Sequence, residues 1–376
     1  MGAARLRERT SSSPSILDEA RLRPFLKWPG GKASELAMIA SATPPLTGRY
    51  VDPFVGGGSV LLSIPGTVPA AANDACPELV LLFRGLASGD LDLARSLGGV
   101  ATAWDELTSD PAGLRAIVDA FTGRSGTGLG EVLAVDVDSA GPGFPEAFGA
   151  RLPTDVAAKL ARMRAVEAKA GHRLSDADLL ANVEGAVRAS FYLTVRDRYN
   201  RARAQGTWDA WRLADFFFLR EFAYASMFRF NKRDEFNVPY GGVTYNRKSM
   251  LAKVAQATAP EMRERLAATE WHVGDFEPFL DAVRPEGDDF VFVDPPYDSQ
   301  FSDYDNRAFA MADQQRLEAA LRRLDCPVMV VIKDSAGIRA LYEHAHWRIA
   351  EAGKTYMWTI KSRNDRSAVH LTITNY

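Results

Sequence analysis

The sequence has little cysteine and little histidine. Its 376 residues include two cysteines and five histidines. Cys76 and Cys326 are far apart and each precedes a proline, so they provide neither a disulfide framework nor the paired spacing of a zinc site. His344 and His346 are two residues apart and would not share a helix face, which favours surface positions over a metal site. We therefore expect no metal.

Long apolar runs and a large excess of one charge are missing too. No apolar stretch is long enough to cross a bilayer, and residues 1–23 have arginines and serines but no apolar signal-peptide core. We interpret residues 1–23 as a flexible N-terminal arm and expect a cytoplasmic protein. The net charge of −3 argues against a uniformly basic surface that would coat nucleic acid.

One local basic stretch is present nevertheless. Between Arg196 and Arg233, nine arginines and lysines accompany four acidic residues and several aromatic side chains. Two interpretations are open for these cations, a phosphate-binding surface or a solvated helix face. For the three consecutive phenylalanines, residues 216–218, we favour a buried aromatic stripe.

The composition is that of a soluble globular protein, with 47% apolar and 25% charged residues. Short apolar segments with the pattern of buried strands alternate with helical segments, which is typical of βαβ units. The predicted strands are residues 49–52, 70–74, 290–294 and 327–333, the predicted helices are residues 79–86, 313–324 and 336–342, and residues 354–361 and 368–376 could form an antiparallel pair at one edge. The expected fold is α/β, with a doubly wound, mostly parallel sheet.

A long middle section interrupts the sheet-forming segments. Residues 87–148 are rich in Ala, Gly, Asp and Ser, which predicts an irregular insertion. Ser175 has the sequence context of an N-cap that opens a long helix running towards Tyr199. Aromatic and polar residues alternate around a charged turn in residues 228–242, which predicts a hairpin loop. We expect one discontinuous domain from residues 24–86 and 250–376, and a mainly helical inserted domain from residues 87–249 with its hairpin near residues 228–245.

A glycine loop, Asp52-Pro53-Phe54-Val55-Gly56-Gly57-Gly58-Ser59, follows the first predicted strand. Its glycines allow a ligand to approach the backbone closely, and a helix start nearby would add a positive dipole end. Asp74 ends the next predicted strand, where an acid can accept hydrogen bonds from ribose hydroxyls. No Lys-Ser or Lys-Thr follows the glycines, which argues against a P-loop. The loop therefore predicts an adenosine-containing cofactor without a triphosphate.

The segment Val291-Phe292-Val293-Asp294-Pro295-Pro296-Tyr297 is the second chemical motif. It places a carboxylate, two prolines and an aromatic ring at the carboxyl end of a buried strand. Such a notch suits a flat ring that carries an exocyclic amine, although a strand followed by a Pro-Pro turn is the structural alternative. Ligands of open α/β sheets bind beyond the carboxyl ends of the strands, so this motif and the glycine loop can face one pocket.

Near the N-terminus, Trp28 lies between Lys27 and Lys32, with a Gly-Gly pair after it. An aromatic face beside two lysines could form the wall of a pocket for a cationic ligand or contact a phosphate. A purely structural tryptophan is the alternative.

Four segments in this order resemble the Dam-type (D12 class) DNA adenine-N6 methyltransferases. They are Phe25-Leu26-Lys27-Trp28-Pro29-Gly30-Gly31-Lys32, the glycine loop, Glu235-Phe236-Asn237-Val238-Pro239-Tyr240-Gly241, and Asp294-Pro295-Pro296-Tyr297. The closing Leu371-Thr372-Ile373-Thr374-Asn375-Tyr376 is similar to the tail of that family. The similarity covers most of the chain except residues 1–22 and roughly residues 87–185.

The resemblance implies a Rossmann-like methyltransferase that uses S-adenosylmethionine and no metal. The residues expected at the cofactor are Trp28, Lys32, Asp52, Phe54, Gly56, Gly58, Asp74, Asp275, Phe276 and Asp294. The target adenine would be rotated out of the duplex, because its N6 atom cannot be reached while it is paired. Asp294, Pro295, Pro296 and Tyr297 would then be catalytic, with Tyr297 stacked on the base and N6 bonded to Asp294 and the Pro295 carbonyl. Methyl transfer would be an in-line displacement between two oriented reactants.

The resemblance also implies that residues 87–249 recognise double-stranded DNA. The expected DNA contacts are Lys27, Arg229, Asn231, Lys232, Arg233 and Pro239. In the family, an Asn-Gly pair usually stands where this chain has Ala225-Ser226, and base-reading side chains stand at Gly242 and Val243. Since Arg229 and Asn231 are retained, the kept and lost contacts predict a recognition site other than GATC. A bacterial or phage monomer is expected, with a cognate restriction or defence system as a candidate partner.

Other functions are compatible with part of this sequence. An Asp-Pro-Pro-Tyr notch could also serve an adenine in RNA or the N4 atom of cytosine, and a catalytically idle DNA-binding relative is a further alternative. Methylation at C5 of cytosine is disfavoured, because that chemistry needs a nucleophilic cysteine after a proline and both cysteines here precede one.

Overall fold

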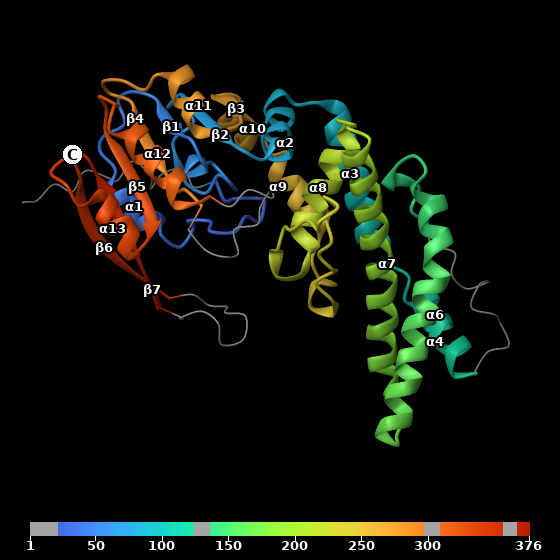
Figure 1. The fold of residues 1–376 in the computed structure, drawn as a ribbon. Coiled ribbons are helices and arrows are strands. Elements are labelled where there is room, and N and C mark those ends of the chain that lie inside the picture. The colour runs from blue at the N-terminus through green and yellow to red at the C-terminus, as the bar shows by residue number, and fades with distance from the viewer. Residues whose placement is uncertain (1–21, 124–135, 297–308, 356–366) are drawn as a thin grey trace, which may run out of the picture.

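A computed structural model describes residues 22–123, 136–296, 309–355 and 367–376. Its centre is a seven-stranded sheet of order β3-β2-β1-β4-β5-β7-β6 (Figure 1). The strands are β1 (Tyr50–Asp52), β2 (Ala70–Asp74), β3 (Thr269–Val273), β4 (Phe290–Val293), β5 (Val328–Lys333), β6 (Arg348–Thr355) and β7 (Ser367–Thr374). Neighbouring strands from β3 to β5 pair in parallel, and β7 and β6 add an antiparallel pair at one edge. The expected mixed α/β fold with a mostly parallel sheet is confirmed.

Helices connect and flank the strands. They are α1 (Leu36–Ala42), α2 (Pro77–Ser88), α3 (Leu91–Glu106), α4 (Pro111–Thr122), α6 (Phe144–Ala170), α7 (Asp176–Ala204), α8 (Ala210–Phe222), α9 (Met250–Ala257), α10 (Pro260–Ala267), α11 (Phe276–Val283), α12 (Met311–Leu321) and α13 (Ala336–Tyr342). No helix in these described ranges is long and apolar enough to span a membrane.

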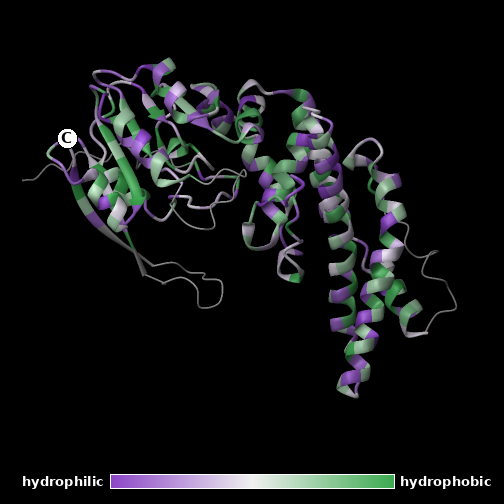
Figure 2. Cartoon of the chain, viewed as in Figure 1, coloured by the Kyte–Doolittle hydropathy of each residue, from purple (hydrophilic) through white to green (hydrophobic). Residues whose placement is uncertain are grey.

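The sheet has a hydrophobic core on each face, because successive side chains of a strand point to opposite sides. Tyr50 belongs to one core and its neighbour Val51 to the other. Helices α1 and α2 contribute to the first core, and α11, α12 and α13 contribute to the second. The apolar colour of the central strands in Figure 2 reflects this burial on both sides.

All four predicted strands form, and the antiparallel pair at the edge is confirmed where the chain is described. Its first strand begins earlier than predicted, at Arg348, and residues 356–366 lie outside the described chain. Strand β3 was not among the predicted strands. It is an edge strand that pairs with β2 on one side. Its sequence therefore includes the polar residues Glu270 and His272 and lacks the continuous apolar run of a central strand.

The prediction of an irregular insertion for residues 87–148 is wrong where the structure describes this part, since α3, α4 and the start of α6 occupy most of it. The Asp and Gly residues that suggested irregularity lie at helix ends. Asp90 and Asp110 are N-caps whose carboxylates accept backbone N–H groups, and Gly89 and Gly123 end helices in the left-handed conformation. Residues 124–135 lie outside the described chain.

The predicted long helix after Ser175 is confirmed. The Ser175 hydroxyl accepts a hydrogen bond from the N–H of Asp178 at 3.1 Å and caps α7. Helices α6 and α7 pack together and project away from the sheet (Figure 1).

In residues 228–242 the predicted hairpin appears as a tight loop with isolated antiparallel bridges instead of a ladder. Phe230 pairs with Phe236 in this way, and Ala223 pairs with Tyr240. The turn is closed by a hydrogen bond from the N–H of Asn231 to the carbonyl of Glu235 at 2.9 Å.

Four of the nine cations in the basic stretch have structural partners. The guanidinium of Arg198 pairs with buried Asp215, and that of Arg212 pairs with buried Glu78. Arg203 also pairs with Glu78, and Arg220 donates two hydrogen bonds to the carbonyl of Lys27. Arg198 therefore joins α7 to α8, and the other three arginines tie these helices to α2 and to the segment around Lys27. The exposed cations of the hairpin remain for the phosphate-binding interpretation. Residues 216–218 are fully buried, as we favoured.

Candidate active site

The glycine loop is shaped by two acids at the carboxyl ends of β1 and β2. Asp52 accepts a hydrogen bond from the N–H of Phe54 at 3.1 Å, and Asp74 accepts one from the N–H of Gly56 at 3.0 Å. The second Asp74 oxygen accepts the N–H of Cys76 at 2.9 Å, which leads the chain into α2. Asp74 was expected to meet a ribose, and its observed bonds fix the backbone of the loop.

Trp28 packs directly on this loop. A Cβ atom on Gly56 would lie 2.7 Å from Cδ1 of Trp28, and one on Gly57 would lie 2.9 Å from the Trp28 Cβ atom. Gly56 also has a φ of +49°, so a side chain there would be both strained and obstructed. The guanidinium of Arg220 covers the indole ring at 4.6 Å. The structure therefore brings Trp28 and the glycine loop together as one wall.

Lys32 connects this wall to the end of β4. Its buried ammonium lies 2.5 Å from Oδ1 of Asp294 and 3.1 Å from the carbonyl of Gly30. Because β1 and β4 are parallel neighbours, Asp52 and Asp294 leave the sheet at the same edge. The two motifs that the sequence predicted to share a pocket are therefore adjacent.

Two further ionisable residues lie behind Lys32 and were not singled out in the sequence. Glu35 Oε2 is 4.0 Å from the Lys32 ammonium, and Nδ1 of His370 on β7 is 3.1 Å from Glu35 Oε1. All three side chains are nearly inaccessible to solvent. The only sequence signals are the three-residue spacing from Lys32 to Glu35 and a histidine inside the apolar strand β7.

The site is electrostatically acidic. Burial raises the pKa of Asp294, and so does the charge of Glu35, while Lys32 and His370 act in the opposite direction. Burial, together with the nearby charges of Asp294 and Asp74, raises the pKa of Asp52 to about 7 against the hydrogen bonds from Tyr50 and Phe54. A cationic ligand beside these carboxylates would relieve their mutual repulsion.

The turn after Asp294 is held from α12. Pro295 is buried, and the carbonyl of Pro296 accepts a hydrogen bond from Nε2 of Gln314 at 3.1 Å. Gln314 is completely buried, and its Oε1 atom has no hydrogen-bond partner among the residues that the structure describes. Sequence reasoning did not find this residue, because it follows no motif. Tyr297 lies outside the described residues.

An aromatic group borders the site on the side of α11. The ring of Phe54 lies 5.5 Å from that of Phe276 and 5.7 Å from that of Phe309. Asp275 caps α11 and pairs with Arg316 at 2.9 Å, and the Arg316 guanidinium covers Phe276 at 5.0 Å. The structure thus places Phe54 and Phe276 together, with Asp275 at the helix start beside them.

The predicted DNA contacts differ in their surroundings. Arg229, Lys232, Arg233 and Pro239 are exposed on the hairpin. Asn231 is partly buried, and its side-chain oxygen accepts the N–H groups of Arg233 and Glu235, so it stabilises the turn itself. Lys27 lies apart from the hairpin tip and pairs with Glu221 of α8 at 3.3 Å.

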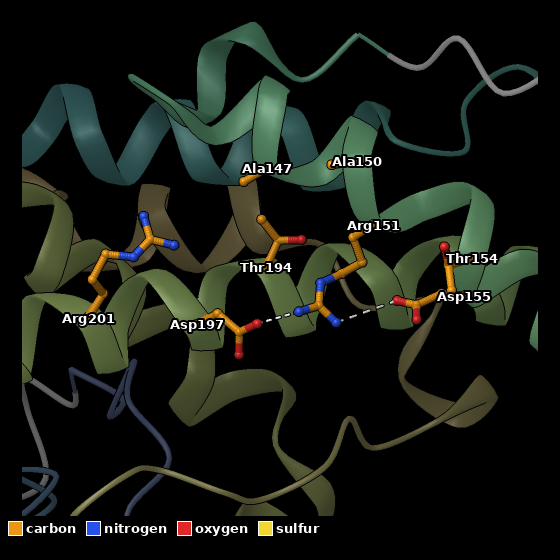
Figure 3. A pocket seen from close by; sticks show the side chains of 8 residues that line it. All are labelled: Ala147, Ala150, Arg151, Thr154, Asp155, Thr194, Asp197 and Arg201. Carbon is orange, nitrogen blue, oxygen red and sulfur yellow. Dashed lines mark hydrogen bonds and ion pairs between the residues drawn. The ribbon is translucent and has the colours of Figure 1, made fainter.

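A pocket of about 390 Å³ lies elsewhere, between α6 and α7 (Figure 3). Arg151 in its wall pairs with Asp155 and Asp197. None of the predicted site residues that the structure describes lines this pocket, so we do not assign the active site to it. Within the described ranges no group of His, Cys, Asp and Glu could hold a metal ion.

Known proteins resemble the chain across this site. A family model described as D12 class N6 adenine-specific DNA methyltransferase matches residues 28–110 and 164–356. The Type II methyltransferase M.MjaIII of Methanocaldococcus jannaschii is 25% identical over 317 residues, which is 81% of each chain. The Type II methyltransferase M1.LlaDCHI of Lactococcus lactis subsp. cremoris is 22% identical over 366 residues, 96% of this chain and 97% of that protein. The DNA N-6-adenine-methyltransferase of Escherichia phage P1 is 31% identical over 169 residues, 42% of this chain and 21% of the phage protein.

The matched segments contain most parts of the site described above, and His370 lies outside them. Trp28, the glycine loop, the hairpin and the Asp294 motif all fall inside them, whereas residues 111–163, with α4 and most of α6, lie between the two segments. The match covers more than half of the chain and confirms the resemblance seen in the sequence. The chain therefore belongs to the D12 class of N6 adenine-specific DNA methyltransferases.

Proposed function

We propose that the protein transfers a methyl group from S-adenosylmethionine to N6 of an adenine that is rotated out of double-stranded DNA. Family membership supports methylation of DNA adenine. The observation that carries the finer proposal is the contact between Lys32 and Asp294. It joins the wall formed by Trp28 and the glycine loop to the motif expected to hold the target amine.

The residues around the glycine loop fit a sulfonium cofactor. The carboxylates of Asp74 and Asp294 are close enough to Asp52 to contribute to its raised pKa. A positive ligand would offset the repulsion among these three groups. S-adenosylmethionine supplies a methyl group on a positively charged sulfur when it is bound. Trp28, Lys32, Phe54, Gly56, Gly58, Asp275 and Phe276 are the further residues proposed to hold it.

For the target base, we propose that Asp294 and the carbonyl of Pro295 accept hydrogen bonds from the exocyclic amine, with Tyr297 stacked on the ring. Gln314 supports this arrangement, because it fixes the neighbouring Pro296 carbonyl and thereby the path of the turn. Extrusion of the base is required, since N6 is inaccessible in a paired adenine.

Residues 87–249 are proposed as the target-recognition domain of a protein whose catalytic domain comprises residues 24–86 and 250–376. Arg229, Lys232, Arg233 and Pro239 offer exposed contacts, and Lys27 and Asn231 complete the proposed set. We propose a site other than GATC, because Ala225, Ser226, Gly242 and Val243 replace the family's usual residues. The type II names of two relatives support a restriction partner. We further propose that the protein acts as a monomer in the cytoplasm of a bacterium.

The test is a methyl-transfer assay with labelled S-adenosylmethionine and genomic DNA, followed by identification of the methylated nucleoside and sequencing of modified adenines. Asp294→Ala should lower turnover by about 10²–10³-fold, as expected when a group aimed at the reacting atom is lost. Cofactor affinity, measured by calorimetry, should fall far less than turnover, because the other proposed cofactor contacts are retained. Asp281→Ala, which removes an exposed acid of α11, serves as the matched control.

Several outcomes would contradict the proposal. Undiminished turnover in Asp294→Ala would remove Asp294 from the reaction. N4-methylcytosine or methylated RNA would favour the alternative substrates, and DNA binding without transfer would indicate an idle relative. Modified adenines confined to GATC would refute the proposed recognition site.

A further inference from the structure

Two lysines from distant parts of the chain, Lys27 and Lys248, meet next to Trp28, which packs on the glycine loop. The ammonium of Lys27 donates a hydrogen bond to the backbone carbonyl of Glu221 at 3.1 Å, and that of Lys248 reaches the same oxygen at 3.4 Å. Both ammonium groups also face the ring of Tyr245, at 5.3 Å for Lys27 and 3.4 Å for Lys248. We call Lys27, Glu221, Tyr245 and Lys248 the lysine pair site.

The lysine pair site carries more positive than negative charge. The carboxylate of Glu221 lies 3.3 Å from Lys27 and is almost fully buried. Burial, together with the contact with Lys27 and the charge of Lys253, lowers the pKa of Lys248 to about 7, while Glu221 acts in the opposite direction. Two cations held this close repel each other, and a second anion would relieve that repulsion.

The position of the site suggests where such an anion comes from. Lys27 directly precedes Trp28, which packs on the glycine loop. Tyr245 and Lys248 follow the hairpin segment, and Glu221 lies at the end of α8 immediately before it. The lysine pair site therefore joins the segment that packs on the glycine loop to the segments on either side of the hairpin, and these are the parts of the chain that the proposed function assigns to the cofactor and to DNA.

We propose that Lys27 and Lys248 together bind one phosphate of the DNA backbone. The inference rests on the proposed function, since it takes DNA as the ligand. A phosphodiester fits because each phosphate carries one negative charge and its oxygens only accept hydrogen bonds, which two ammonium groups can donate. The carboxylate of a cofactor shares this chemistry, and the experiment below separates the two sources.

The sign of the pH dependence follows from the charge of Lys248. A bound phosphate favours the charged ammonium and so raises the pKa of Lys248 above its value of about 7 in the free protein. Well below pH 7 the free protein already carries this charge, and binding takes up no proton there. Above pH 7 a proton must be taken from solvent, so the affinity for DNA falls as the pH rises.

The experiment measures binding of the full chain to a short labelled duplex by fluorescence anisotropy, over a range of salt, well below and well above pH 7. Lys248→Met keeps the aliphatic stem over Tyr245 but has no charge, and Lys248→Arg is charged at both pH values. Lys169→Met, which removes an exposed lysine at the end of α6, is the control.

At low pH, the slope of log K against log salt should be shallower by about 0.9 in Lys248→Met than in the original protein, as for one lost phosphate contact. The loss of DNA affinity on raising the pH through 7 should disappear in both Lys248 variants. Of the two, Lys248→Arg should remain the tighter binder. Lys169→Met should behave like the original protein.

Identical salt slopes and pH profiles in the original protein and Lys248→Met would overturn the inference. So would a loss of S-adenosylmethionine affinity in Lys248→Met with unchanged DNA affinity, because the anion would then be the cofactor carboxylate. Methylation is assayed separately. If the original protein binds DNA and methylates adenine while Lys248→Met is indistinguishable from it, only this inference fails. If the original protein binds no DNA, the proposed function fails with it.

Discussion

Gln314 fixes the second proline of the segment Asp294-Pro295-Pro296 from a neighbouring helix. Its amide nitrogen bonds to the Pro296 carbonyl, while its own oxygen is buried and has no hydrogen-bond partner within the described part of the chain. An unpaired buried acceptor costs free energy, so this amide is better explained by the bond that its nitrogen makes. We interpret Gln314 as a positioning residue for the turn that, under the proposed function, holds the target amine.

Gln314→Met should lower kcat by about tenfold, equivalent to about 1.4 kcal/mol, the strength of a good hydrogen bond. The side chain keeps its length and apolar stem, and removal of the unpaired oxygen offsets the loss of one bond. We therefore expect little change in thermal stability or in KM for the cofactor. Steady-state kinetics and thermal melting check this. A matched loss of stability and activity would indicate a purely structural role.

Residues that the sequence singled out in separate motifs lie close together in the structure. Trp28 packs on the glycine loop, and Lys32 contacts Asp294 at the carboxyl end of β4. The roles of these residues stay predictions. Gln314 and His370 could not be found in this way. Each reaches the site from a different element, and neither belongs to a recognisable sequence motif. Whether Tyr297 stacks on a base stays a prediction.

At the scale of elements, the short turn before the hairpin is strained. Ala225 and Ser226 have φ angles of 51° and 55°, in the left-handed region that disfavours residues with a side chain. The turn persists because hydrogen bonds on both sides hold it, from the N–H of Tyr224 to Pro239 and from that of Gly241 to Phe222. The family's usual Asn-Gly pair at this place would adopt the same angles more easily.

Ala225→Gly should therefore raise the free energy of unfolding by about 1 kcal/mol, because glycine adopts a positive φ without steric cost. Ala225→Asn should give a smaller gain for the same reason. Urea denaturation measures both. The control is Ala157→Gly at an exposed position inside α6, which should lose about 1 kcal/mol. A loss of stability at both alanines would show that the turn is not strained in solution.

Element types were predictable from the sequence when local pattern and tertiary role agreed. The buried strands are short apolar runs, and their alternation with helical segments predicted a mostly parallel sheet. The helices of residues 87–148 were missed, since Ala, Gly and Asp occur both in irregular chain and in short capped helices. What decides between these is burial of side chains such as Leu97 and Trp104 against α8, which composition does not reveal.

At the scale of the whole molecule, one buried carboxylate joins the sheet to the helical section. Glu78, at the start of α2, accepts hydrogen bonds from Tyr199 and Arg203 of α7 and from Arg212 of α8. Burial alone would raise the pKa of Glu78, but the hydrogen bonds and charges of Arg212 and Arg203 outweigh it, and the pKa is lowered. The charged form of Glu78 is therefore favoured by folding.

Glu78→Gln should lower the free energy of unfolding by about 3 kcal/mol near neutral pH, because the buried guanidinium of Arg212 loses its counter-charge and the half-buried Arg203 loses one of its two carboxylate partners. Because the folded pKa lies below the ordinary value of 4.5, this contribution is present above pH 4.5 and is lost as the pH falls through the folded pKa. The difference between variant and original protein should therefore shrink on acidification. Asp92→Asn breaks an exposed pair with Arg95 and should cost less than about 1 kcal/mol. Urea titrations across this pH range decide the matter, and a difference independent of pH would mean that shape rather than charge at Glu78 joins the two parts of the molecule.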